Sequence, residues 1–455
     1  MHAPGFLACC RQAQSQLGGI AAYALTGQVV SVTGLMVDIA GLSRHLAVGD
    51  RVALQTRAGT EASAEIVGFR AGRAQAMMHG ATDGLGPGSR ATTHPGHRGA
   101  SLAVGDDWIG RVIDPLGRAL DGRGPLPPGP ARRPVRASPP EAASRARLGP
   151  RVDLGVAALN LFATCRAGQR LGLFAGSGIG KSTLLAMLAR HTACDVAVLA
   201  LVGERGREVR EFLEDDLGEA GAARAVTVVA TSDASALLRR QAAYTAMTVA
   251  EHFRDQGLHV LLLFDSVTRF CLALREIGLS AGEPPATRGY PPSVFAELPR
   301  LLERAGPGPE VAGRPAGQIT AVFTVLVEGD DHNEPVADAV RGILDGHVVL
   351  DRRIGESGRY PAVDVLRSLS RTVPGCLTPD EAALARRARD ILSRHADIAD
   401  LVRLGAYKSG ADAQADEALR LAPRLEALLA QGRDRRVTLD ESFAGLAAVL
   451  TEAAP

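Results

Sequence analysis

The residues best suited to chemistry lie in the stretch AGSGIGKST, residues 175–183. Glycines let backbone N–H groups approach a phosphate closely, and the N-terminus of a following helix adds favourable partial charge. In this arrangement the Lys181 ammonium reaches the β- and γ-phosphates of a nucleotide, and the Ser182 hydroxyl ligates Mg²⁺. The stretch therefore predicts a nucleotide-binding loop, with Ala175 where the usual pattern has its first glycine.

Composition supports a special role for the lysine of this loop. Of the 51 lysine and arginine residues, only Lys181 and Lys408 are lysines. A compact, mobile ammonium suits phosphate chemistry, and this chain uses arginine almost everywhere else. The predicted nucleotide-binding residues of the loop are Gly176, Ser177, Gly178, Ile179, Gly180, Lys181, Ser182 and Thr183.

Two carboxylates that follow apolar runs are candidates for holding the metal and activating water. Asp265 ends the run HVLLLFD, where a carboxylate would complete the Mg²⁺ shell through a water molecule. Glu204 follows the run Val196–Val202, where a carboxylate can face the γ-phosphate and orient a water for in-line attack. From the pattern alone the plain alternatives stay open: a turn-capping aspartate and a solvated glutamate at a helix start.

The elements that must position these side chains are alternating apolar runs and helical stretches in the middle of the chain. The expected strands are residues 170–174, 196–202, 226–230, 259–264, 319–327 and 347–350. Such alternation indicates a largely parallel sheet covered on both faces, in which nucleotide sites lie at the carboxyl ends of the strands. We therefore expect an α/β core.

The regions on either side of this core differ from it in character. Short β-rich segments separated by Gly- and Asp-containing turns predict a small closed barrel near the N-terminus. Near the other end, Thr378–Glu381 has the sequence of a capping box and precedes an amphipathic helical run. The expected divisions are an N-terminal docking segment 1–24, a β-barrel domain 25–95, a phosphate-loop ATPase domain 96–378 with a proline-rich connector at 125–140, and a C-terminal helical domain 379–455.

Overall composition excludes several classes of protein. A formal net charge of +1 over 455 residues argues against a strongly polyanionic partner, so we expect no nucleic acid partner. The six cysteines show no metal-binding spacing and indicate a reducing, cytoplasmic setting. The apolar runs are only strand-length, so we expect neither a signal peptide nor a membrane span, and membrane association only through partners.

Several segments together resemble the ATPases related to the catalytic subunit of the rotary ATP synthase, and in particular the flagellum-specific ATPases of type III protein export. They are the phosphate loop, VGERGREVREF at 202–212, LLLFDSVTRF at 261–270, and the segments 283–306, 327–352 and 359–371. Within the last segment, Pro361–Ser370 fits the family signature at every position. The resemblance covers essentially the whole chain, and the export branch tolerates alanine at position 175.

The resemblance implies roles that spacing alone does not provide. Glu204 matches the catalytic glutamate that polarises the attacking water, and Arg205 and Arg269 match basic residues around the γ-phosphate. Tyr360 matches the aromatic residue that packs against adenine. Arg371 matches the arginine finger presented to the nucleotide of the neighbouring subunit, so the resemblance implies a homohexamer with a RecA-like P-loop ATPase domain.

The implied function is Mg-ATP hydrolysis that energises type III export of flagellar proteins during flagellum assembly. The resemblance places the chain in the cytoplasm, at the face of the inner membrane near the flagellar base. The implied partners are an export-apparatus regulator that binds the N-terminal segment, a coiled-coil stalk in the central pore, the cytoplasmic domain of the export gate, and chaperone–substrate complexes. A segment near residues 330–333 is expected to face the pore.

Three other functions are alternatives to flagellar export. The ATPase of a virulence-type injection machine shares these motifs. The flagellar function is favoured over it by the overall resemblance of the sequence and not by any single motif. A rotary synthase subunit is disfavoured by the proline-rich connector, the segment 283–306 and Ala175. A hexameric RNA translocase would need aromatic and basic residues on the barrel, whereas residues 1–95 contain seven arginines, five acidic residues and few aromatics.

Overall fold

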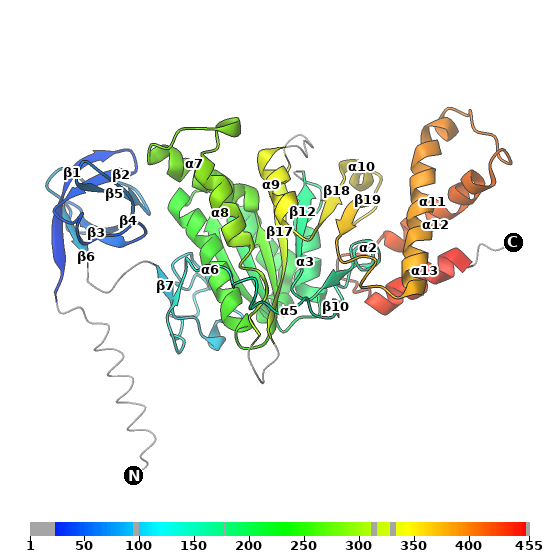
Figure 1. Cartoon of the computed structure of the whole chain (residues 1–455), viewed down its shortest axis with the longest axis horizontal. Coiled ribbons are helices and arrows are strands. Elements are labelled where there is room, and N and C mark those ends of the chain that lie inside the picture. Colours follow the sequence, from blue (N-terminus) through cyan, green and yellow to red (C-terminus); the bar gives the residue numbers. More distant parts are fainter. Residues whose placement is uncertain (1–22, 94–99, 177, 311–315, 328–333, 452–455) are drawn as a thin grey trace, which may run out of the picture.

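The computed structural model has three parts in a row: a barrel, a large core with a central sheet, and a group of C-terminal helices (Figure 1). The structure describes residues 23–93, 100–176, 178–310, 316–327 and 334–451. The predicted fold class, an α/β core with an N-terminal barrel and C-terminal helices, is confirmed. The predicted docking segment 1–24 lies outside the described residues except for its last two positions, and the predicted pore segment 330–333 lies wholly outside them.

The N-terminal barrel is closed by six antiparallel strands in the order β1-β2-β5-β4-β3-β6. Side chains alternate between the inside and the outside, as the two-residue period of a strand requires, so that Val37 and Ile39 of β2 face the barrel core. The strands are β1 Leu25–Thr33, β2 Met36–Ala40, β3 Arg51–Gln55, β4 Glu61–Arg70, β5 Arg73–Met78 and β6 Arg90–Thr93. The barrel therefore has an apolar core of its own.

The central sheet has the order β19-β18-β12-β17-β15-β13-β14-β8, and its strands are parallel except for β19, which runs antiparallel to β18, and the short β16, which runs antiparallel to β17. Its strands are β8 Val112–Ile113, β12 Arg170–Ala175, β13 Val196–Glu204, β14 Ala225–Thr231, β15 His259–Asp265, β17 Gln318–Leu326, β18 Gly346–Leu350 and β19 Val363–Ser370, with β16 Gly306–Pro307 paired to β17. Two small sheets pair β7 Ser101–Leu102 with β9 Arg133–Pro134, and β10 Arg151–Val152 with β11 Cys165–Arg166.

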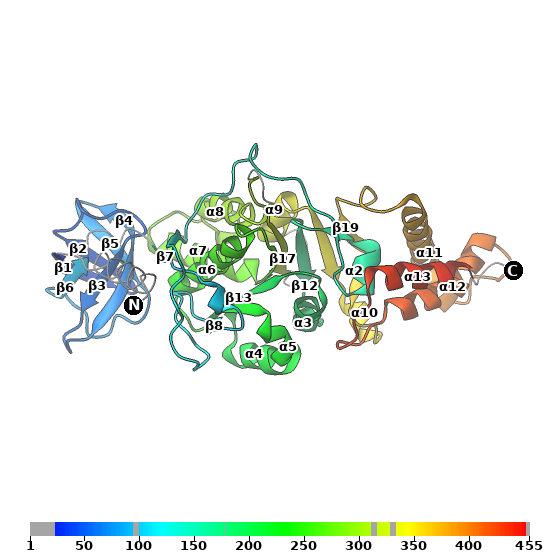
Figure 2. The ribbon, with the colours of Figure 1, turned by 90° about the horizontal axis from the view of Figure 1, so that it is seen from below.

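Helices cover both faces of this sheet (Figure 2). Neighbouring residues of one strand pack into different apolar clusters, as Leu263 and Phe264 of β15 do, because both faces are buried. The helices of the core are α2 Ala157–Phe162, α3 Lys181–His191, α4 Gly206–Glu211, the π-helix η2 Phe212–Leu217, α5 Gly218–Ala223, α6 Ala236–Arg254, α7 Val267–Ser280, α8 Pro292–Leu302, α9 Pro335–Ile343 and α10 Arg352–Glu356, with short 3₁₀ turns η1 Asp106–Trp108 and η3 Thr287–Gly289.

The C-terminal helices are α11 Pro379–Arg403, α12 Ala413–Leu429 and α13 Leu439–Thr451. The predicted capping box opens α11: the Thr378 hydroxyl accepts from the Glu381 backbone N–H, and the Glu381 carboxylate accepts from the Thr378 backbone N–H. Buried residues of these helices, such as Leu421 and Leu446, belong to the same apolar cluster as α3 and one face of the sheet. The C-terminal helices and the core therefore share a hydrophobic core.

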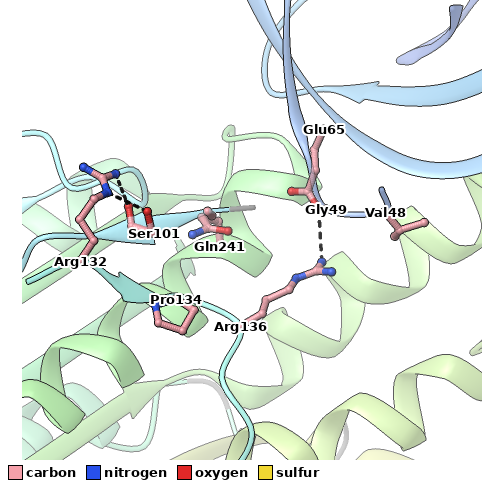
Figure 3. Close-up of a pocket in the computed structure, with 9 residues that line it drawn as sticks. Val48, Gly49, Glu65, Ser101, Arg132, Pro134, Arg136 and Gln241 are labelled. Atoms are coloured by element: carbon pink, nitrogen blue, oxygen red, sulfur yellow. Dashed lines mark hydrogen bonds and ion pairs between the residues drawn. The ribbon is translucent and has the colours of Figure 1, made fainter. Parts of the chain in front are cut away.

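The barrel meets the core at a joint that is rich in charge (Figure 3). Glu65 of β4 accepts from the guanidinium of Arg240 at 2.6 Å and lies 3.4 Å from the guanidinium of Arg136. Both Glu65 and Arg240 are only 4% exposed, so this ion pair lies out of water. A cavity of about 320 Å³ beside it is lined by residues of the barrel and the core, including Gly49 and Gln241.

Two expectations from composition can be compared with the structure. The four cysteines among the described residues, Cys165, Cys194, Cys271 and Cys376, are free thiols. In the part of the chain that the structure describes, no helix is both long and apolar enough to cross a bilayer.

Candidate active site

The glycine-rich loop follows β12 at the centre of the sheet and leads directly into α3, which begins at Lys181. Gly180 has φ of +84°, and a Cβ at this position would lie 3.3 Å from Cε1 of Tyr360, so both the backbone and the space favour glycine. Ile179 is 3% exposed and packs into the core, so only its backbone faces a ligand. Ser177 lies outside the described residues.

Lys181 lies between the two predicted carboxylates. Its Nζ donates to Oδ1 of Asp265 at 2.5 Å and to Oε1 of Glu204 at 3.4 Å. Burial by itself would lower the pKa of Lys181, but the two carboxylates outweigh burial and hold this pKa above its usual value. The lysine is therefore charged at neutral pH and ready to bind phosphate oxygens.

Asp265 is the last residue of β15 and is buried, 4% exposed. Thr324 on the neighbouring strand β17 donates its hydroxyl hydrogen to Oδ1 of Asp265 at 2.7 Å, which fixes the carboxylate toward Lys181. Ser266 follows and caps α7 by accepting from the Arg269 backbone N–H at 3.3 Å. The end of a parallel strand and the start of a helix thus hold Asp265 at the edge of the sheet predicted from its sequence position.

Glu204 is the last residue of β13, the strand beside β15 in the sheet. Burial raises the pKa of Glu204 above its ordinary value, and the neighbouring Lys181 charge opposes this shift. A carboxylate with a raised pKa, placed beside a phosphate-binding lysine, is suited to accept a hydrogen bond from a water molecule.

These side chains line a pocket of about 750 Å³, a volume within the range of small-molecule sites. The predicted residues that line it are Gly176, Gly178, Gly180, Lys181, Ser182, Thr183, Glu204, Arg205 and Arg269. A small adjoining cavity of about 70 Å³ is lined by Ser182, Glu204 and Asp265 among others. Hydroxyl and carboxylate oxygens are the donors that Mg²⁺ prefers, so this set of residues fits the metal.

The two predicted arginines near the γ-phosphate differ in their surroundings. The Arg269 side chain begins close to the sheet because Gly203 has φ of +76° and no side chain, and a Cβ there would lie 3.0 Å from Cβ of Arg269. Its buried Nε has no hydrogen-bond partner among the described residues. The Arg205 side chain is 73% exposed and pairs with Glu208 at 3.0 Å, so it lines the outer part of the pocket.

Tyr360 lies against the phosphate loop, within van der Waals reach of Gly180. The residue is 47% exposed and lies beside the loop, outside the set of residues that line the pocket. The structure thus brings the predicted adenine-packing residue to the phosphate-binding residues, although 179 positions separate it from Lys181 by their numbers, 360 and 181.

Arg371 lies far from the phosphate loop of its own chain. It directly follows β19, whose last residue Ser370 pairs with Gly346 at the start of β18. The backbone N–H of Arg371 donates to the carbonyl oxygen of Asp345, and Asp345 also pairs with Arg170 at the start of β12. The loop lies at the other end of β12, and six residues of strand span roughly 20 Å.

Some pocket residues were not identified from the sequence. They are Glu208, Thr268, Leu272, Leu326, Val327 and Arg352. Glu208 lies on α4, which follows Glu204 and β13 directly, and no local pattern marks it as a pocket residue. No local pattern marks Thr324, which orients Asp265, because its role depends on which strands are neighbours in the sheet.

Comparisons with known protein families match two parts of the chain. The profile of the ATP synthase alpha/beta family, nucleotide-binding domain, matches residues 155–370. The profile of the T3SS EscN ATPase C-terminal domain matches residues 377–448. The first match contains the phosphate loop, Glu204, Asp265 and Tyr360.

Individual relatives match over nearly the whole chain. The flagellum-specific ATP synthase of Caulobacter vibrioides is 53% identical over 93% of this chain and 95% of its own length. The type 3 secretion system ATPase of Xanthomonas euvesicatoria is 45% identical over 94% of each chain. The assembled ATPase EscN from the enteropathogenic E. coli type III secretion system, in complex with its central stalk EscO, has a TM-score of 0.84, with 36% identity over 93% of this chain and 100% of that chain.

Proposed function

The chain belongs to the ATP synthase alpha/beta family as an ATPase of type III protein export, and we propose that it energises flagellar export by hydrolysing Mg-ATP at sites shared between subunits. The observation that carries the proposed site is the position of Lys181 between Glu204 and Asp265 at the end of the phosphate loop. Each of these residues ends a strand or begins a helix at the same edge of one sheet.

In the proposed binding step, the ATP phosphates replace the two carboxylates as partners of Lys181. The backbone N–H groups of Gly178 and Gly180 and the start of α3 face the phosphates. Ser182 and Asp265 would hold Mg²⁺, Asp265 through water, and the bound metal would supply positive charge beside the phosphate oxygens. The Tyr360 ring packs against adenine beside Gly180.

In the proposed hydrolysis step, Glu204 accepts a hydrogen bond from a water molecule and aims the water oxygen at the γ-phosphorus. The water oxygen forms a bond to phosphorus and gives a proton to the Glu204 carboxylate, while the bond from phosphorus to the β–γ bridging oxygen breaks and its electron pair stays on ADP, so that ADP and inorganic phosphate result. Arg269, whose buried Nε has no partner among the described residues, stabilises the γ-phosphate charge, and Arg205 approaches it from the pocket rim.

We further propose that Arg371 completes the site of a neighbouring copy in a homohexamer. Its position at the opposite end of β12 from the phosphate loop supports action on another subunit, because it cannot reach its own site across the sheet. A guanidinium in this role is typically worth about 10³ to 10⁵ in rate. The assembled state named for EscN is consistent with such a ring.

The proposed partners follow from the same family membership. EscN is described in complex with its central stalk EscO, and we propose an equivalent coiled-coil stalk for this chain. We also propose a regulator that binds residues 1–24, the cytoplasmic domain of the export gate, and chaperone–substrate complexes. The proposed location is the cytoplasmic face of the inner membrane at the flagellar base, reached through these partners.

The first test is Glu204→Gln, introduced at the chromosomal locus and in purified protein. Gln keeps the size of the side chain but is a weaker acceptor for the attacking water, so Mg-ATP hydrolysis should fall by about 10² or more. Steady-state phosphate release, nucleotide binding and swimming motility are measured together. ATP binding should persist and flagellar filaments should be lost.

Glu211→Gln is the matched control, since this exposed glutamate of α4 pairs with Arg207 and is not among the described residues that line the pocket, so the variant should retain most of the activity. Unchanged hydrolysis in Glu204→Gln would show that Glu204 is not the residue that activates the attacking water. Lost hydrolysis with normal flagella would support the ATPase activity but not the flagellar role. It would assign the chain to a virulence-type secretion machine instead.

A further inference from the structure

The loop between α12 and α13, residues 430–438, contacts the backbone of Tyr360, whose side chain lies beside the phosphate loop. We propose that Gln431 in this loop is a positioning residue, which holds Tyr360 in register with the phosphate loop and so sets the affinity for the adenine part of the nucleotide. This inference rests on the proposed adenine-packing role of Tyr360.

The first step is a direct backbone contact. The backbone N–H of Gln431 donates to the carbonyl oxygen of Tyr360 at 2.8 Å. Tyr360 itself precedes β19, and its ring is half exposed beside Gly180, so few contacts hold that ring from the solvent side. The position of its backbone therefore decides where the ring lies relative to the phosphate loop.

The second step is the anchoring of Gln431. Its side chain is 5% exposed and has a partner on each side of the amide: Oε1 accepts from the Ala157 backbone N–H at 2.9 Å, while Nε2 donates to the carbonyl oxygens of Gly155 and Arg435 at 2.8 and 2.6 Å. A buried amide with donors and acceptor all satisfied has one orientation. Gln431 is thus fixed to the segment 155–157.

The third step connects that segment to the phosphate-binding helix. Gly155 lies against the C-terminal end of α3, and a Cβ at Gly155 would lie 2.3 Å from Cβ of His191. Arg190, also in the last turn of α3, pairs with Asp434 at 2.8 Å and donates to the carbonyl oxygen of Arg433 at 2.6 Å. The loop 430–438 therefore contacts the helix that carries Lys181 as well as the backbone of Tyr360.

A second contact joins the C-terminal helices to the residue that precedes Tyr360. Arg359 is buried and forms an ion pair with Glu426 of α12, while its guanidinium also donates to the carbonyl oxygen of Val363 at 2.8 Å. Arg359 and the backbone of Tyr360 are thus held by the end of α12 and by the loop that follows it. A shift of the C-terminal helices would move Tyr360 relative to the phosphate loop.

The test compares ligands with and without a base. Gln431→Met keeps the volume but removes all three side-chain hydrogen bonds, so the backbone at 431 loses its anchor. Titration calorimetry of the full chain with Mg-ADP should show about tenfold weaker binding, the range of a lost aromatic contact. Binding of inorganic pyrophosphate with Mg²⁺ should be unchanged, because pyrophosphate has no base to pack against Tyr360.

Two further variants separate the explanations. Tyr360→Ala should weaken Mg-ADP and not pyrophosphate, and the double variant with Gln431→Met should be no weaker than Tyr360→Ala alone, because Gln431 acts through Tyr360. Gln414→Met, an exposed glutamine of α12 changed in the same way, is the control and should bind both ligands as the unaltered chain does.

Three outcomes would overturn the inference in different ways. Equal losses for Mg-ADP and pyrophosphate in Gln431→Met, with a lower melting temperature, would make Gln431 a structural residue only. An additive double variant would show that Gln431 acts independently of Tyr360. If Tyr360→Ala leaves the ratio of the two affinities unchanged, the proposed role of Tyr360 itself fails, and with it the role of Gln431.

Discussion

The two joints of this molecule are built in different ways. At the barrel joint, the buried pair Glu65–Arg240 and the nearby Arg136 connect a barrel whose apolar core is its own. Among the described residues, a small apolar cluster that includes Met77 and Leu237 spans the two parts. At the C-terminal joint, by contrast, α11, α12 and α13 bury their side chains in the cluster that also contains α3 and the sheet.

This difference shows that the two outer parts can be coupled to the nucleotide site to different degrees. A buried ion pair is costly to desolvate and strongly destabilising to break, but it adds little net stability, so the barrel depends mainly on its own apolar core. A shared apolar cluster makes the C-terminal helices part of the same cooperative unit as the nucleotide site. Nucleotide occupancy should therefore be felt more strongly by the C-terminal helices than by the barrel.

Glu65→Ala should produce the largest change, and that change should lie at the joint between the barrel and α6. It leaves Arg240 buried without its carboxylate, which typically costs about 3–5 kcal/mol. Hydrogen exchange should show faster exchange in β3, β4 and β5, while Mg-ATP affinity changes less than twofold. Glu61→Ala, an exposed residue of the same strand, is the control. Equal exchange in the two variants would show that the pair does not hold the joint.

Leu421→Ala should have a somewhat smaller effect that extends into the nucleotide site. Leu421 of α12 is fully buried in the shared cluster, and such truncations cost about 2–5 kcal/mol. We expect faster exchange in α3 as well as in α12, and a melting transition that saturating Mg-ADP restores in part. Leu401→Ala, which removes a 48% exposed leucine of α11, should change neither. Faster exchange in α12 alone would contradict a shared unit.

The smallest predicted effect is a pH dependence of the barrel joint. Burial lowers the pKa of His79 from 6.5 to about 4, with the Arg51 charge acting in the same direction and Glu65 opposing. The unfolded chain takes up a proton below pH 6.5 while the folded barrel does not, so stability falls as the pH drops from 6.5 towards 4.

Between pH 6.5 and pH 5 this histidine should remove about 2 kcal/mol of unfolding free energy, measured by urea titration at both pH values. His79→Gln should reduce that loss, and His45→Gln, which changes an exposed histidine of the barrel, should not. If His79→Gln and the unaltered chain lose the same unfolding free energy between the two pH values, His79 is not the cause of the pH dependence.

Much of the fold was predictable because its signals are local. The apolar runs that end at Asp265 and before Glu204 are strands buried on both faces, and such runs need no knowledge of their neighbours. The phosphate loop and the capping box at Thr378 likewise depend on residues close in sequence. The carboxylates were placed at the sheet edge on this basis, and the structure has them there.

The rest depended on contacts between distant residues. The antiparallel direction of β19, which sends Tyr360 to one end of the sheet and Arg371 to the other, is decided by strand order rather than by the composition of the strand. Glu65 and Arg240 are 175 positions apart, and neither lies in a pattern that marks a pair. Gln431 carries no chemical motif at all, because its importance comes only from the backbone groups around it.

The eight residues of β19 separate Arg371 from the end of the sheet that carries the phosphate loop, and this separation predicts how mutant alleles behave together in one cell. In the proposed ring, one allele that alters Lys181 and another that alters Arg371 damage different halves of a shared site. A cell that carries both alleles assembles mixed rings, in which some sites combine the intact lysine of one product with the intact arginine of the other. Two alleles that are each defective alone should then complement, whereas two alleles that alter the same half should not.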